Sequence, residues 1–234
     1  MTDGLITLSA SKLKTFTACE RKYYYEYIDR RESKKHPAAA LGTAVHKTIE
    51  RVYKEGTDPA PIFLAEFDKE IVQYEDVDVD LRKYRADGVK MVQLYKFDRR
   101  VPVEMELEFL LPFPNQAHPL CNIRGIIDQT YDWGFVDLKT NRSKPLHSVL
   151  DNDIQFILYD WAYNEIYNTP AVNRVWNHLR TGEDLYADTT GKLDNATRAI
   201  ERILEKQVTG IYDRSIGDPC RICNFRLPCL GRED

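Results

Sequence analysis

The residues best suited to chemistry lie in one short stretch, 124–140, which reads RGIIDQTYDWGFVDLKT. The pattern predicts two short strands joined by a turn at 131–134, with Asp128 in the first strand and Asp137 and Lys139 in the second. Because side chains alternate between faces along a strand, Asp137 and Lys139 point the same way. With Asp128 beside them they form a compact polar cluster. The alternative interpretation is a solvated hairpin face that carries a surface ion pair.

The cysteines form a second group. Cys220, Cys223 and Cys229 make a C-x2-C-x5-C run in a short, turn-rich tail. In a reducing cytosol such a run favours a bound metal or cluster. Three thiolates need a fourth ligand, and Cys19 is the candidate if the first helix packs beside the tail. Zinc and an iron–sulfur cluster both remain open, because both accept four thiolates. Cys121 begins a strand and is expected to be a core or edge thiol.

The elements that position these residues are predicted from the spacing of apolar side chains. Helical spacing predicts a helix that starts at Ser9 or Ser11 and contains Cys19, and a second helix over Ala38–Glu55 with His46 beside its apolar stripe. A lone histidine there is either a core residue or a functional one. Further elements are a broken helical region over 59–98, with an acidic connector at 75–80, helices over 151–167 and 193–208, and strands from 103, in the hairpin and over 172–179. This order predicts a mixed α/β domain around a small sheet.

The composition limits the classes of function. The chain has 234 residues, of which 43% are hydrophobic and 30% charged, as in a soluble globular protein. A formal net charge of −4 excludes a uniformly basic nucleic-acid coat, so any nucleic-acid site must be a local patch. The segment 12–35, with eight Lys/Arg against four Asp/Glu, is either that patch or a solubilising helix face. No apolar run approaches the roughly 20 residues of a membrane span. The first residues lack a signal-peptide core, so we expect a cytoplasmic protein that does not contact membranes.

Taken together, these residues resemble the PD-(D/E)XK nuclease superfamily and, within it, the RecB-like branch that carries an iron–sulfur cluster and includes CRISPR-associated and phage-encoded exonucleases. The resemblance consists of separate blocks in the family's order: LGTAVHKTIE with His46, RGIIDQ with Asp128, VDLKT with Asp137 and Lys139, and DIQFILYDWA with Gln155 and Tyr159. The family also places one cluster cysteine near the N-terminus and three near the C-terminus, which is the arrangement of Cys19, Cys220, Cys223 and Cys229.

The resemblance implies a restriction-endonuclease-like α/β core, a small mixed sheet flanked by helices, within a single domain over residues 1–234. Residues 1–100 would be mainly helical, 101–210 would form the nuclease core, and 211–234 would be a cysteine-rich tail that binds a [4Fe-4S] cluster, with Zn2+ as the alternative. The implied activity is that of a metal-dependent exonuclease on single-stranded or end-bearing DNA. It would serve recombination, repair or CRISPR-type processing, alone or with other proteins of those processes. The alternative is a non-catalytic DNA-binding or adaptor subunit.

The resemblance also implies a role for each matched residue. His46, Asp128, Asp137 and the carbonyl group of Leu138 would bind Mn2+ or Mg2+, and the imidazole shifts the preference toward Mn2+. Lys139 would stay protonated beside two carboxylates and would orient the attacking water or offset developing charge. Gln155 would position Lys139 or the water, and Tyr159 would position the DNA backbone.

Overall fold

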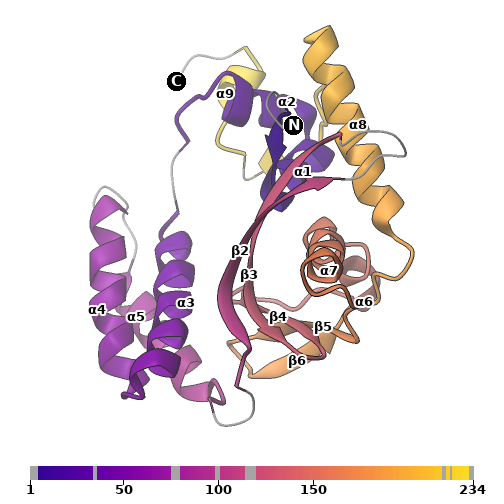
Figure 1. Ribbon diagram of the computed structural model, residues 1–234. Helices are drawn as coiled ribbons and strands as arrows, with labels where there is room; N and C mark the ends of the chain where they lie inside the picture. The colour runs from indigo at the N-terminus through magenta and orange to yellow at the C-terminus, as the bar shows by residue number, and fades with distance from the viewer. Residues whose placement is uncertain are drawn as a thin grey trace.

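The computed structural model describes residues 5–33, 36–74, 80–97, 101–113, 120–217, 220–221 and 223–231. In this part of the chain a six-stranded mixed sheet is flanked by helices, which confirms the predicted mixed α/β class (Figure 1). The strands are β1 Thr7–Leu8, β2 Glu104–Phe113, β3 Cys121–Tyr131, β4 Gly134–Lys139, β5 Asn173–His178 and β6 Glu183–Tyr186. The helices are α1 Ala10–Ala18, α2 Glu20–Tyr23, η1 Tyr24–Ile28, α3 Pro37–Glu55, α4 Pro59–Ile71, η2 Val72–Tyr74, α5 Leu81–Leu94, α6 His147–Leu150, α7 Ile154–Tyr167, α8 Leu193–Thr209 and α9 Arg226–Cys229. None of the described helices combines the length and the apolar character that a membrane crossing requires.

The hairpin of β3 and β4 lies at the centre of the sheet, whose order is β1-β3-β4-β5-β6 with β2 paired to β3. β3 and β4 are antiparallel, whereas β4 and β5 are parallel. The predicted turn is confirmed, and Gly134 at its end is required there. A Cβ atom on Gly134 would lie 2.0 Å from the carbonyl oxygen of Asn173, and its φ of 142° is unfavourable for other residues. This glycine therefore lets β5 pass directly beside the turn.

Two layers of helices cover the sheet (Figure 1). One apolar cluster joins α1, α7 and α8 to the sheet through Ile127 and Phe135, among others. A second cluster joins α3, α4 and α5 to the sheet through Val136 and Leu138. Phe135 and Val136 are neighbours on β4 and belong to different clusters, as alternation along a strand requires. β4, which carries the predicted Asp137 and Lys139, is thus buried on both faces.

Local signals explain most helix boundaries. Ser9 caps α1 by accepting a hydrogen bond from the Lys12 N–H, as predicted. α3 begins at Pro37 and ends before Gly56, whose φ is 67°. The helix predicted over 151–167 is α7 and begins at Ile154, because the Asp153 side chain caps it by accepting from the Gln155 N–H. The short α6 just before it was not predicted. β1, β6 and the π-helix η1 were not predicted from the sequence. The expected acidic connector falls mainly outside the described residues.

The predicted position of Cys19 inside a continuous helix is wrong. Cys19 has an extended backbone, with φ −165° and ψ 114°, and separates α1 from α2. The next residue, Glu20, is buried and binds Arg202 (2.5 Å) and Lys206 (3.3 Å) of α8. Glu20 also accepts a hydrogen bond of 3.1 Å from the Asp213 N–H. These contacts hold the start of α2 against the segment that leads into the cysteine-rich tail.

Candidate metal centre

Three side chains from different elements meet at one point of the structure. His46 projects from α3, Glu106 from β2 and Asp128 from β3, and one potential ligand atom of each lies within 4.8 Å of the other two. His46 Nδ1 is 3.4 Å from Asp128 Oδ1 and 3.8 Å from Glu106 Oε1. Among the described residues this is the group of histidine, cysteine and carboxylate side chains close enough to share one cation.

Glu106 is the member of this group that the sequence did not identify. Glu106 lies in the strand predicted from 103, to which the sequence assigns no functional residue. The register of β2 and β3 passes from Met105–Gln129 to Leu107–Ile127, so Glu106 lies opposite Asp128. Glu106 has a left-handed backbone, with φ 51°, a conformation that costs energy in a non-glycine residue. Such strain at a carboxylate that faces a histidine is typical of functional sites.

Asp137 and Lys139 of β4 lie beside this group. The Asp137 carboxylate is buried, and its Oδ2 is 2.6 Å from Lys139 Nζ. This contact agrees with the predicted common face of Asp137 and Lys139. Asp128 Oδ2 accepts a hydrogen bond of 2.6 Å from the Leu138 N–H. The Leu138 carbonyl oxygen is 3.0 Å from His46 Nε2, so backbone atoms of β4 fix both the carboxylate and the imidazole.

The carboxamide of Gln155 organises the other side of the pair. Its oxygen accepts hydrogen bonds from Lys139 Nζ at 3.2 Å and from Lys14 Nζ at 3.1 Å. Its nitrogen donates to Asp137 Oδ1 at 3.1 Å and to the Tyr159 hydroxyl at 3.0 Å. Gln155 and Tyr159 are one helical turn apart on α7, which explains why both reach the same point. All four contacts together leave the carboxamide a single orientation.

The electrostatics of the group follow from burial and close opposite charges. Burial lowers the pKa of the His46 imidazole, but Asp128 and Glu106 outweigh that effect and raise it to about 10. Burial raises the pKa of Asp128, yet the His46 imidazolium and the Lys139 ammonium hold it below its usual range. Burial would lower the pKa of Lys139, but Asp137 and Asp128 raise it. Without a metal, the carboxylates are therefore paired with imidazolium and ammonium cations.

The donor set suits a divalent cation. The two carboxylates supply hard oxygen atoms and the imidazole a nitrogen, which is a combination that Mn2+ and Mg2+ accept. The carboxylates already attract cationic side chains to the same point, which shows that the position favours positive charge. A cavity of about 510 Å3 opens over the group, and its lining includes His46, Glu106, Asp128, Asp137, Lys139, Gln155 and Tyr159.

The structure thus brings to one cavity the six site residues singled out in the four sequence blocks, which are His46, Asp128, Asp137, Lys139, Gln155 and Tyr159. Asp137 lies outside the group of three ligand atoms and contacts Lys139 instead. The carbonyl oxygen of Leu138 is within hydrogen-bond distance of His46 Nε2. The register of β2 against β3 is the signal that would have identified Glu106, because it places Glu106 directly across from Asp128.

The cysteines meet at a different place. Cys19, Cys220, Cys223 and Cys229 line one cavity of about 190 Å3, whose lining also includes Lys22 of α2 and Arg226 of α9. Within the described residues no three of their sulfur atoms lie within 4.8 Å of one another. Burial raises the pKa of the Cys229 thiol, and the neighbouring Cys19 and Cys223 raise it further. Cys121 is buried elsewhere, which agrees with its predicted role in the core.

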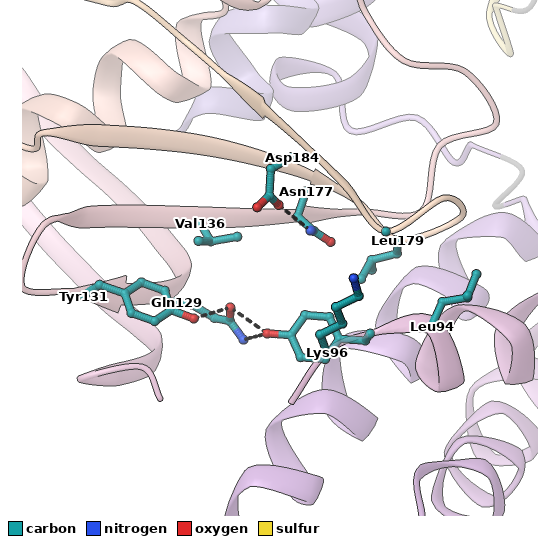
Figure 2. A pocket seen from close by; sticks show the side chains of 10 residues that line it. Leu94, Lys96, Gln129, Tyr131, Val136, Asn177, Leu179 and Asp184 are labelled. Carbon is teal, nitrogen blue, oxygen red and sulfur yellow. Dashed lines mark hydrogen bonds between the residues drawn. The ribbon is translucent and has the colours of Figure 1, made fainter. Parts of the chain in front are cut away.

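A third cavity is too small to compete with the metal centre as a substrate site. It is lined by Gln129, Val136 and Asn177, among others, and shares no lining residue with the cavity over the metal centre (Figure 2). The Gln129 carboxamide is fixed by the hydroxyl groups of Tyr95 and Tyr131. The cavity measures about 40 Å3, which is room for a few water molecules.

A family model described as PD-(D/E)XK nuclease superfamily matches residues 7–229. No curated protein matches the chain.

Proposed function

Because the chain belongs to the PD-(D/E)XK nuclease superfamily, we propose that it is a metal-dependent nuclease that hydrolyses phosphodiester bonds of DNA. The observation that carries this proposal is the convergence of His46, Glu106 and Asp128 beside the Asp137–Lys139 pair. We propose further that it is an exonuclease on single-stranded or end-bearing DNA, in recombination, repair or CRISPR-type processing. The resemblance of the sequence blocks to RecB-like exonucleases supports this finer assignment.

His46, Glu106 and Asp128 are the residues proposed to hold Mn2+ or Mg2+, with Asp137 and the Leu138 carbonyl as further oxygen donors. A divalent cation held there supplies a Lewis acid for the phosphate and lowers the pKa of water. Three ligands from α3, β2 and β3 fix its position relative to β4. Because each ligand comes from a different element, folding and metal binding are coupled.

Lys139 is proposed to act as an ammonium ion. Its raised pKa keeps it charged at neutral pH, so it donates hydrogen bonds to water or to a phosphate oxygen instead of accepting a proton. Gln155 and Asp137 each accept from Lys139 Nζ, which leaves the third donor of that ammonium for the substrate. Tyr159 keeps its proton because burial raises its pKa, so its hydroxyl can donate to the DNA backbone.

The direct test uses end-labelled single-stranded and double-stranded DNA, incubated with Mg2+ and Mn2+ in parallel. We expect progressive shortening from an end, and no product when a chelator is present. Circular single-stranded DNA, which has no ends, should stay intact. Cleavage of the circle would reject the exonuclease assignment but not the nuclease assignment. If DNA is bound but never cut, the chain is instead the non-catalytic adaptor subunit.

We also propose that Cys19, Cys220, Cys223 and Cys229 bind a [4Fe-4S] cluster and that residues 1–234 form one nuclease domain. The shared cavity of the four thiols supports the cluster. A zinc ion draws thiolates to about 2.3 Å from itself, so their sulfur atoms lie about 4 Å apart. A cluster binds each thiolate through a separate iron, so it fits the wider spacing of these cysteines better.

The cluster has a simple test. The purified protein should be brown, and Cys223→Ala should remove the colour and the iron. Cys121→Ala is the matched control, because Cys121 is buried away from the cavity and should leave the colour unchanged. A colourless wild-type protein that contains one equivalent of zinc would favour the Zn2+ alternative.

A further inference from the structure

Two cavities meet at the metal centre. The first, of about 510 Å3, extends toward α1 and reaches Ser9, Ser11 and Lys14. The second, of about 620 Å3, extends between α3 and β2 and reaches Lys47 and Glu50. His46 and Glu106 line both, so they form the boundary between them. A strand bound at the metal centre could therefore leave it in either direction.

The two cavities differ in charge. Apart from the shared residues, the first is lined by Lys14, Arg124 and Lys139 against Asp128 and Asp137, so cations are in excess. The second is lined by Lys47 against Glu50 and Glu108, so carboxylates are in excess among its lining side chains. Lys47 is bound to Glu70 at 2.7 Å, and Glu50 is bound to Lys54 at 2.5 Å. A polyanion is attracted to the first cavity and repelled by the second.

Lys14 and Arg124 can both reach a ligand in the first cavity. The Lys14 side chain is 39% exposed, and its partner Asp153, at 2.8 Å, is partly exposed as well. The Arg124 side chain is 64% exposed, and its contact with Glu108 is long, at 3.8 Å. Partly exposed ion pairs are weak, so exchanging these carboxylates for a phosphate costs little. Arg124 lies on the same strand as Asp128. Lys14 and Lys139 donate to the same oxygen of Gln155, so Lys14 and Arg124 each have a direct structural connection to the metal centre.

We propose that the nucleic-acid strand crosses the metal centre on the α1 side, where Lys14 and Arg124 contact backbone phosphates that flank the bond to be cut. This inference rests on the proposed nuclease function. It makes the basic segment 12–35 a phosphate-binding element through Lys14, and it adds Arg124, which lies outside that segment. The cavity between α3 and β2 does not carry the strand.

The test is the salt dependence of binding. A labelled single-stranded oligodeoxynucleotide is titrated with the full chain in chelator, so that it is not cut, at salt concentrations from about 50 to 200 mM. Each phosphate contact that is lost lowers the slope of log K against log salt by about 0.7 for a single strand. Lys14→Ala and Arg124→Ala should each show this decrease. Lys47→Ala is the matched control and should keep the wild-type slope.

The outcomes separate this inference from the nuclease proposal. If Lys14→Ala and Arg124→Ala both keep the wild-type slope, or if Lys47→Ala lowers it equally, the assigned path is wrong even when the protein cuts DNA. If the slopes change as expected but Mn2+ produces no cleavage, the strand path stands and the nuclease proposal fails. Arg124→Ala decides the matter if Lys14→Ala does not fold, because the exposed Arg124 side chain contributes little to packing.

Discussion

Binding of a divalent cation should depend steeply on pH, because the cation must displace a proton from His46. The pKa of His46 is raised to about 10 by Asp128 and Glu106 in the metal-free protein. An imidazolium cannot bind a metal, so metal affinity rises with pH until the His46 proton is lost. At pH 7 this competition lowers the affinity about a thousandfold, or about 4 kcal/mol, relative to a deprotonated site. Between pH 7 and pH 8 the Kd for Mn2+ should fall about tenfold.

The measurement is isothermal titration of Mn2+ into the metal-free protein at both pH values, in buffers that differ in ionisation enthalpy. The buffers count the protons released, and we expect close to one proton for each Mn2+ bound. The control is His46→Asn, which should bind more weakly and with almost no pH dependence in this range. If the wild-type protein binds Mn2+ equally well at both pH values and releases no proton, His46 is not a ligand and the site is misassigned.

Three substitutions test other parts of the site. Lys139→Ala should reduce hydrolysis by about a hundredfold or more while oligonucleotide binding stays near the wild-type value, because it removes a donor to developing charge; persistent cleavage would contradict its role. Glu106→Gln should weaken Mn2+ binding by about ten- to a hundredfold, whereas Glu108→Gln, whose side chain is 69% exposed, should not; equal effects would reject Glu106 as a ligand. Gly125→Ala should lower the free energy of unfolding by about 1–3 kcal/mol in urea, because its Cβ would lie 2.4 Å from Phe109 Cζ. Gly42→Ala, with 3.5 Å to its nearest neighbour, should not destabilise the protein.

The hairpin and the helices could be predicted because their signals are local. Alternation along β4 and the turn that ends at Gly134 depend on residues close in sequence. The Ser9 cap of α1 is equally local. β1 and β6 are short, with two and four residues, and form by pairing with other strands of the sheet. They are too short for an alternation of apolar and polar residues to predict them. The break at Cys19 was also missed, since Glu20 and the segment around Asp213 fix it from outside the helix.

The residues of the site also divide into those with a local sequence signal and those placed by contacts with distant parts of the chain. Asp128, Asp137 and Lys139 follow from the strand pattern and the family resemblance. Glu106 depends on which residue of β2 faces Asp128, and the register that decides this comes from the folded sheet. Lys14 depends on the packing of α1 against α7, which brings its ammonium to Gln155 from far away in the sequence. Residues placed by register and packing are therefore the ones that sequence reasoning does not reach.

α1 connects the metal centre to the cavity that the four cysteines line. Lys14 on α1 contacts Gln155 at the metal centre, and Cys19 at the end of the same helix lines the cysteine cavity. Five residues of helix span only about 7.5 Å along its axis, so the helix has little freedom to move at one end alone. A group bound by the four thiols, as proposed, would therefore hold Lys14 in position at the metal centre. Loss of that bound group should weaken the strand contacts before it changes the ligands on α3, β2 and β3, which are anchored by the sheet.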